Sequence, residues 1–147
     1  MRFRCAIAAL CALLAVGLLA TAAPTVARQH GVVQPHLRAL GKEPAFAHLK
    51  RFLHSLRGRD HVSGHRLHAL VAKRRHLNSQ VSHTLEVRDR ARAKYLNKYL
   101  AKKRPRHRKR IARTSRRYYS YVRSLEGYRV RQVLAEISDE LDRLAYS

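Results

Sequence analysis

The chain has 147 residues, of which 32 are Lys or Arg and 9 are Asp or Glu, so its formal net charge is +23. This length suits one small domain and excludes two of ordinary size. So high a positive charge opposes compaction unless a polyanion neutralises it, which favours a nucleic acid or an anionic membrane as the partner.

The N-terminal stretch, residues 1–27, predicts a targeting segment. Arg2 and Arg4 precede a long apolar run, and small residues follow at positions 20–22, as in a secretory signal peptide. A single membrane anchor is the alternative. Both cysteines, Cys5 and Cys11, lie in this stretch, so its cleavage would leave no disulfide and no thiolate metal ligand.

Residues 28–42 are basic, free of acid and interrupted by glycine and proline, which indicates a linker. An acid-free basic stretch behind a signal-like segment is also typical of a bipartite address to a plastid. A mitochondrial presequence is a further interpretation of the same composition.

An amphipathic helix is predicted from residue 43 to Gly58. Glu43 and Pro44 favour a helix start, because proline suits the first helical position and an acid suits the positive end of the helix dipole. Gly58 is a suitable stop. The apolar positions follow at three- and four-residue steps and are predicted to pack in the core: Phe46, Leu49, Phe52, Leu53 and Leu56.

Residues 60–81 predict a second helix, which packs against the first as a helical hairpin. Its apolar residues share one face, and Lys73, Arg74 and Arg75 point away from it. This pattern is expected of a helix lying along phosphates, and a solvated amphipathic helix shows it too. The apolar positions are Leu67, Leu70, Val71, Leu77 and Val81.

The polar residues 78–80 weaken this pattern, so a kink or a helix end is predicted there. Helical periodicity resumes from Leu85 to Leu100. Basic residues take the other positions, namely Arg88, Arg90, Arg92, Lys94 and Lys98.

Residues 102–117 begin with the basic cluster KKRPRHRKR, which Pro105 splits. Nothing in that cluster is apolar, so we expect no folding by itself. An RNA-contacting turn, a disordered arm and a nuclear-localisation patch are the interpretations, the last disfavoured by the signal-like N-terminus. The predicted phosphate contacts are Lys102, Lys103, Arg104, Arg106, Arg108, Lys109 and Arg110.

The last predicted element is an amphipathic helix over residues 118–147, with Thr114 and Ser115 as a possible cap. Its heptad seam is too short for a free coiled coil, so docking on the earlier helices is expected. Four tyrosines among arginines suit stacking on unpaired bases, and core packing explains them equally well. The seam is Val130, Leu134, Ile137, Leu141 and Leu144, and the tyrosines are Tyr118, Tyr119, Tyr121 and Tyr128.

These elements predict an all-α fold. It is a small helical bundle or hairpin with a long basic helix and a C-terminal helical extension. Residues 43–101 would form the helical RNA-binding domain, ahead of the basic cluster and the last helix.

One motif resembles a known family. Asp60, His61, Val62 and Ser63, followed by the leucines above and by KRR-x-L at 73–77, are similar to the universal small-subunit ribosomal protein fifteen family. There an Asp-His-x-Ser turn leads into a helix ending in Gly-Lys-Arg-Arg-x-Leu. This chain has Ala72 where glycine is common and Gln80 where the family has an aromatic residue. The resemblance covers about a third of the chain.

The resemblance implies an all-helical protein that binds a junction of helices in small-subunit ribosomal RNA. It implies that Asp60 and Ser63 contact an RNA minor groove and that Arg74 and Arg75 meet phosphates. A polar turn before a one-sided basic helix also suits A-form RNA, whose wide minor groove displays 2′-hydroxyls. The predicted RNA-binding residues of this stretch are Asp60, His61, Ser63, His65, Arg66, Lys73, Arg74 and Arg75.

Catalytic and metal sites are disfavoured. His61, His65 and His68 share helical spacing, but Asp60 is the one carboxylate near them, so no metal and no cofactor are predicted. Asp60, His61 and Ser63 are chain neighbours, whereas a catalytic triad is assembled across a fold. We therefore expect a protein that is not an enzyme and has no small-molecule substrate.

The sequence thus favours a structural rRNA-binding protein of an organellar small ribosomal subunit, in a plastid or mitochondrion. Its partners would be ribosomal RNA and neighbouring ribosomal proteins. It would make no stable membrane contact once the N-terminal segment is removed. The alternatives are a secreted cationic protein acting on anionic membranes or polymers, and an organellar DNA-packaging protein.

Overall fold

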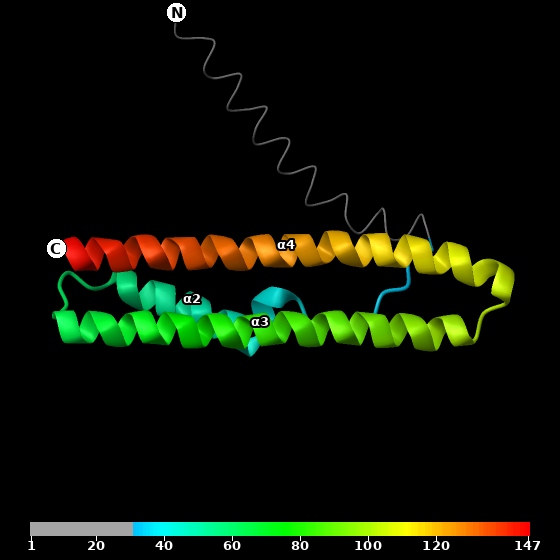
Figure 1. The fold of residues 1–147 in the computed structure, drawn as a ribbon, viewed down its shortest axis with the longest axis horizontal. Helices are drawn as coiled ribbons and strands as arrows, with labels where there is room; N and C mark the ends of the chain where they lie inside the picture. The colour runs from blue at the N-terminus through cyan, green and yellow to red at the C-terminus, as the bar shows by residue number, and fades with distance from the viewer. Residues whose placement is uncertain (1–30) are drawn as a thin grey trace, which may run out of the picture.

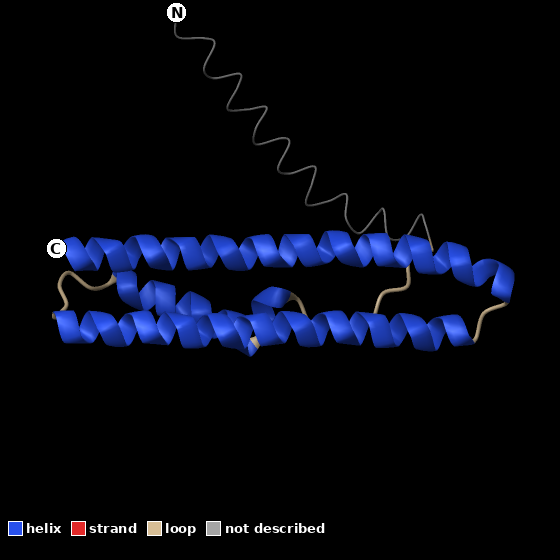
Figure 2. Ribbon diagram, in the orientation of Figure 1, coloured by secondary structure: helices blue, strands red, loops and turns tan. Residues whose placement is uncertain are grey.

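The computed structural model describes residues 31–147, which form helices and no strand (Figures 1 and 2). The elements are the 3-10 helix η1 (Leu40–Lys42) and the α-helices α2 (Pro44–Arg57), α3 (Gly64–Ala101) and α4 (Pro105–Tyr146). The prediction of an all-α fold is confirmed. The predicted targeting segment, residues 1–27, lies outside the described residues.

The two long helices form an antiparallel hairpin. Figure 1 shows α3 and α4 side by side along their lengths, with the turn between them at one end and the C-terminus at the other. The shorter α2 packs against both, at the end where α4 finishes. Three helices therefore surround one end of the molecule, and two continue to the other.

The hydrophobic core lies where α2 meets the hairpin. All five apolar residues predicted for α2 are buried, and Gly58 is its C-cap as expected. Val81 of α3 and Ile137 of α4 are fully buried against them. Four residues of the predicted heptad seam are also buried and Leu134 is partly buried, so the seam docks within the chain, as predicted.

The expected kink at residues 78–80 is absent, because α3 continues to Ala101. Leu77 and Val81 are buried on either side of these three residues and keep the helix against its neighbours. Ser79 and Gln80 are exposed, so their polar side chains face solvent without disturbing the packing. The polar tripeptide therefore marks an outer face of α3 and no break in the helix.

The predicted start of the last helix is also wrong. Thr114 and Ser115 lie inside α4, which begins at Pro105, and the Thr114 hydroxyl donates to the Arg110 carbonyl at 3.1 Å. The basic cluster, whose composition predicts no folding by itself, is thus helical from Pro105, with its turn at residues 102–104. We call residues 97–117 the basic arm; Ser115 is its one buried residue.

Residues 31–39, which we call the N-terminal strap, belong to the stretch predicted to be a linker. The structure corrects this, because Val33 is buried and its backbone is bonded to α4 at both polar groups. The Val33 amide donates to Ser115 Oγ at 3.2 Å, and the Tyr119 hydroxyl donates to the Val33 carbonyl. The strap therefore packs on the long hairpin before the chain enters η1 and α2.

Candidate nucleic-acid interface

The turn between α2 and α3 exposes the polar residues of the sequence motif. Val62 is buried and anchors the turn, whereas Asp60, His61 and Ser63 are exposed. Ser63 is the N-cap residue of α3, but its side chain makes no capping hydrogen bond. The hydroxyl of Ser63 is therefore not used by the helix that it precedes, although capping is the usual role of serine there.

The end of α4 holds this turn in place. Arg143 donates from Nη2 to the carbonyls of Leu56, at 3.3 Å, and Arg59, at 2.9 Å. Its Nε lies 2.8 Å from Oε2 of Glu140, which orients the guanidinium. Backbone carbonyls near a helix end are good partners for an arginine. The turn is thus positioned by a helix from the far end of the sequence.

The basic residues of α3 do not all face outward as predicted. His65, Arg66, Lys73 and Arg75 are exposed, but Arg74 is half-buried and donates to the Leu134 carbonyl at 3.5 Å. The reason is its position, because residue 74 lies four residues after Leu70 and three before Leu77, both of which are buried. Arg74 thus stands on the packed face between two core leucines.

Lys73 differs from its neighbours in another way. Its ammonium group lies 5.2 Å from the centre of the Phe52 ring of α2, within the range of a cation–π interaction. It remains exposed and able to meet an anion. The structure therefore brings together at one end of the hairpin five exposed motif residues, with Lys73 and Arg75 further along α3. The five are Asp60, His61, Ser63, His65 and Arg66.

The predicted cluster at residues 102–110 lies at the opposite end. The Arg108 side chain is partly engaged in hydrogen bonds to the backbone, because its Nε donates to the Lys103 carbonyl at 2.7 Å and its Nη2 to the Ala101 carbonyl at 3.3 Å. A cation at a helix C-terminus is favourable, so Arg108 stabilises the end of α3. Lys103 lies 4.7 Å above the Tyr99 ring. The other cluster residues are exposed, namely Lys102, Arg104, Arg106, Lys109 and Arg110.

The two groups of predicted RNA contacts are therefore far apart. With 38 residues in α3 and about 1.5 Å of rise per residue, the turn at residues 60–63 and the cluster at residues 102–110 are separated by roughly 55 Å. No single compact site contains both. A ligand that meets both groups must itself be long, as a folded RNA is.

A buried ion-pair network between these ends was missed by sequence reasoning. Oε1 of Glu126 on α4 accepts from Arg88 Nη2 at 2.6 Å and from Arg92 Nη2 at 2.7 Å, both on α3. Arg88 Nη1 also donates to Glu43 Oε1 at 2.7 Å and to the Arg38 carbonyl at 2.8 Å. The sequence prediction, which places both arginines among the basic positions away from the apolar face, is wrong. Their spacing from Val81 and Leu85 could have shown that they continue the buried face.

Ionisation in this network follows from its geometry. Burial by itself would raise the pKa of Glu126, but the hydrogen bonds from Arg88 and Arg92 outweigh it and lower the pKa below its ordinary value. Burial would likewise lower the pKa of Arg88, yet Glu126 and Glu43 raise it. Glu126 and Arg88 therefore each favour the charged form of the other.

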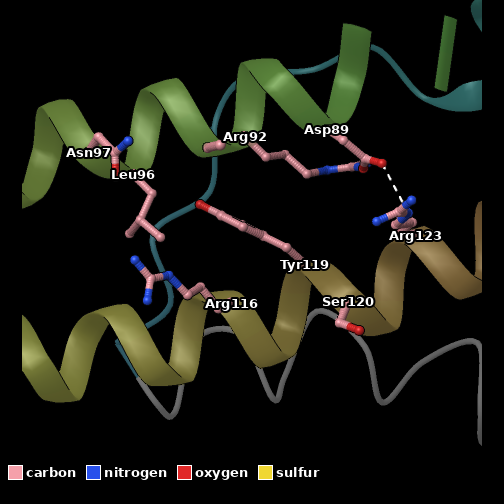
Figure 3. A pocket seen from close by; sticks show the side chains of 9 residues that line it. Asp89, Arg92, Leu96, Asn97, Arg116, Tyr119, Ser120 and Arg123 are labelled. Atoms are coloured by element: carbon pink, nitrogen blue, oxygen red, sulfur yellow. Dashed lines mark hydrogen bonds and ion pairs between the residues drawn. The ribbon is translucent and has the colours of Figure 1, made fainter. Parts of the chain in front are cut away.

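A pocket of about 350 Å³ lies between α3 and α4 on the arm side of this network (Figure 3). Tyr119 projects from α4 into the space between the helices, and burial raises the pKa of its hydroxyl. Arg123 Nε lies 3.1 Å from Asp89 Oδ2 across the pocket mouth. Arg116, which also lines the pocket, is exposed. The pocket thus lies between the packed part of the hairpin and the basic arm.

Three further findings bear on the site. Within residues 31–147, no group of three or more His, Cys, Asp or Glu side chains is placed to hold a metal ion. In the same part of the chain, no helix is both long and apolar enough to cross a membrane. Comparison with protein-family models, with curated proteins and with solved structures finds no match. The ribosomal resemblance therefore stays a prediction from the motif at residues 60–77.

Proposed function

We propose that the chain is a structural RNA-binding protein, and that its ligand is folded ribosomal RNA of an organellar small subunit. The observation that carries the proposal is the basic arm. Eleven of its 21 residues are Lys or Arg and none is Asp or Glu. One of these cations lies on α3, three lie in the turn at residues 102–104, and seven lie on the first turns of α4. Such a density of positive charge suits a ligand with regularly spaced phosphates.

The arrangement of apolar groups favours a nucleic acid over a membrane. Amphipathic helices that lie on membranes expose an apolar face to the lipid. In the basic arm no residue with a large hydrophobic side chain is fully exposed; Tyr99, Leu100 and Ile111 are half-buried. The arm therefore offers charge to its partner and little apolar area.

The turn at residues 60–63 supplies the feature by which RNA would be distinguished from any other polyanion. Asp60 and Ser63 present an acceptor and a hydroxyl at an exposed corner. Groups of this kind hydrogen-bond to 2′-hydroxyls and base edges in the minor groove of A-form RNA. DNA has no 2′-hydroxyls. The arm would then supply most of the affinity, and the turn would determine where on the RNA the protein binds.

A titration of the purified protein against a small-subunit rRNA junction tests the proposal. We expect the junction to bind more tightly than an unbranched duplex of equal length. Asp60→Ala with Ser63→Ala should reduce that preference by about 1–3 kcal/mol, because two hydrogen bonds to the RNA are removed. The matched control is Asp139→Ala with Ser82→Ala, which removes the same groups from exposed positions elsewhere.

Two results would defeat the proposal. One is equal binding to every duplex, with Asp60 and Ser63 making no difference. The other is a mature protein found outside the cell and never in a ribosomal particle, which a tagged copy followed through organelle purification and sedimentation would reveal. Co-sedimentation with an organellar small subunit supports the finer assignment.

A further inference from the structure

Exposed apolar side chains gather on one face of α4. Within residues 31–147, six large hydrophobic residues are exposed, and three of them lie within eight residues of each other: Tyr121 (43% exposed), Leu125 (42%) and Tyr128 (54%). With the half-buried Tyr118 they follow steps of three, four and three, so they form a single stripe along the helix. We call these four residues the tyrosine stripe.

Three of the four stripe residues line a groove of about 590 Å³ between α4 and the N-terminal strap, and the fourth, Tyr121, lies outside the groove on the same exposed face of α4. Pro35 and Leu37 of the strap face Tyr118, Leu125 and Tyr128 across it. The strap is held to α4 through Val33, so the groove has two fixed walls. Solvent-exposed apolar area beside a lined groove is characteristic of a binding surface.

The charges around this groove select its occupant. Arg38 and Arg129 line it and are exposed, and the exposed Arg117 adjoins Tyr118 in the sequence. The one acid in its lining is Glu126, whose carboxylate is buried and bonded to Arg88 and Arg92. A partner that suits this surface has flat groups to contact the aromatic rings and negative charges to pair with the exposed arginines. An unpaired nucleic-acid strand has both properties, in its bases and its phosphates.

We propose that the tyrosine stripe and its groove bind an unpaired strand of RNA, with bases stacked on Tyr121 and Tyr128 and phosphates held by Arg117 and Arg129. From Tyr118 to Tyr128 the stripe spans roughly 15 Å at 1.5 Å per residue, the length of about four stacked nucleotides at 3.4 Å each. This inference rests on the proposed function in taking RNA as the ligand. It adds a second mode of contact, which acts on single strands and needs no base-paired helix.

The test compares two substitutions of the same pair of tyrosines. Tyr121→Leu with Tyr128→Leu keeps apolar side chains but removes the rings, whereas Tyr121→Phe with Tyr128→Phe keeps the rings and removes the hydroxyls. Tyr146→Leu is the control, because Tyr146 is 92% exposed at the far end of α4. The probe is an oligouridylate of about 12 nucleotides, used alone and paired with oligoadenylate.

We expect the leucine pair to weaken binding of the single strand by about 5-fold to 150-fold for each ring that stacks on a base. The phenylalanine pair and the Tyr146 control should stay within about twofold of the parent protein. The slope of log affinity against log salt should be unchanged, since every cation that meets a phosphate is retained. The chain has seven tyrosines and no tryptophan, so tyrosine fluorescence can be followed without tryptophan emission. Quenching by the bound strand that is seen in the parent protein and reduced in the leucine pair reports stacking on these two rings.

Single-strand affinity that is unchanged in the leucine pair would overturn the inference and indicate an apolar docking face for another protein. An absence of tyrosine quenching in the parent protein would overturn it too, whatever the variants do. These outcomes are separable from failure of the proposed function. If duplex and junction binding persist while the tyrosine variants make no difference, this inference alone fails; if no RNA binds at all, both fail.

Discussion

The two ends of the α3–α4 hairpin share a backbone geometry but differ in what holds them together. All fourteen buried residues of the hydrophobic core lie outside the basic arm, in the part of the molecule where α2 packs. The arm has no buried apolar residue and eleven cations. Burial of apolar area stabilises the first region, whereas charge repulsion opposes the second until an anion neutralises it. Apolar burial thus holds together one end of the two helices, whereas the other end carries a high density of positive charge and no apolar core.

The ion-pair network of Arg88, Arg92 and Glu126 marks the boundary between these regions. It lies beyond Val81 and Val130, the last buried apolar residues of the main core on α3 and α4, and before the arm begins. Replacing such a network with apolar residues is often harmless, but removing one partner leaves buried charge without compensation. Substitutions on the two sides of this boundary should therefore differ in their effects on the free energy of unfolding and on RNA binding.

The largest effect is expected from Glu126→Ala. The side chains of Arg88 and Arg92 are 7% and 6% exposed, so removal of their shared carboxylate should lower the free energy of unfolding by about 3–5 kcal/mol. Urea unfolding followed by circular dichroism measures it. Glu136→Ala is the control, because the Glu136 and Arg57 side chains are 48% and 53% exposed and such pairs contribute about 1 kcal/mol or less. Equal destabilisation of the two variants would contradict the boundary role.

The next effect distinguishes the regions by their packing. Ile137→Ala removes a fully buried side chain and should cost about 2–5 kcal/mol. Ile111→Ala makes the same chemical change in the arm, where the residue is half-buried, and should cost about 1 kcal/mol or less. A similar cost at both positions in a denaturant titration would mean that the arm has a core of its own.

A smaller effect is expected from acid. Because the folded-state pKa of Glu126 is lowered from its usual value near 4.5, its contribution to stability is complete above that value. It is lost as the pH falls below 4.5 and through the lower pKa of the folded state. Midpoints of thermal unfolding between pH 7 and pH 3 would show this decline. In Glu126→Gln, which does not titrate, the part of the decline due to this residue should be missing.

The smallest effect on stability is expected in the arm, where the effect on binding is large. Arg106→Gln with Lys109→Gln and Arg110→Gln changes three exposed side chains and should alter the free energy of unfolding by no more than about 0.5 kcal/mol. The slope of log RNA affinity against log salt should fall by roughly 0.7 to 0.9 for each phosphate that the protein no longer neutralises.

The matched control for this variant removes three exposed cations elsewhere, Lys50→Gln, Arg51→Gln and Arg131→Gln. Both triple variants lower the net charge equally. If both reduced RNA affinity and salt dependence to the same extent, total charge would explain the binding and the arm would have no special role.

Sequence periodicity predicted the parts of the fold where apolar residues recur. The start and end of α2 and the docking of the C-terminal seam are confirmed. The prediction failed where polar residues take packed positions. Arg88 and Arg92 continue the buried face of α3 by spacing, but their charge is typical of solvated positions. Their partner Glu126 is 34 and 38 residues away in the sequence, and no local pattern brings them together.

Individual residues of the candidate site were predicted from the sequence, but their arrangement in space was not. The exposure of Asp60, His61 and Ser63 agrees with the motif, whereas Arg74 proved to be half-buried. The motif and the cluster at 102–110 lie at opposite ends of the hairpin because α3 is continuous between them. The predicted kink at 78–80 did not allow for this continuity. The apolar groove beside the strap was also beyond prediction, because residues 31–39 carry no helical or strand pattern.

The attachment of Val33 to α4 has a consequence for how the chain acquires its structure. Its two partners, Ser115 and Tyr119, are 82 and 86 residues further along. During synthesis the strap, α2 and α3 thus emerge before the helix that completes their packing, and contacts so distant in sequence form late. The strap should therefore stay undocked until α4 has been made.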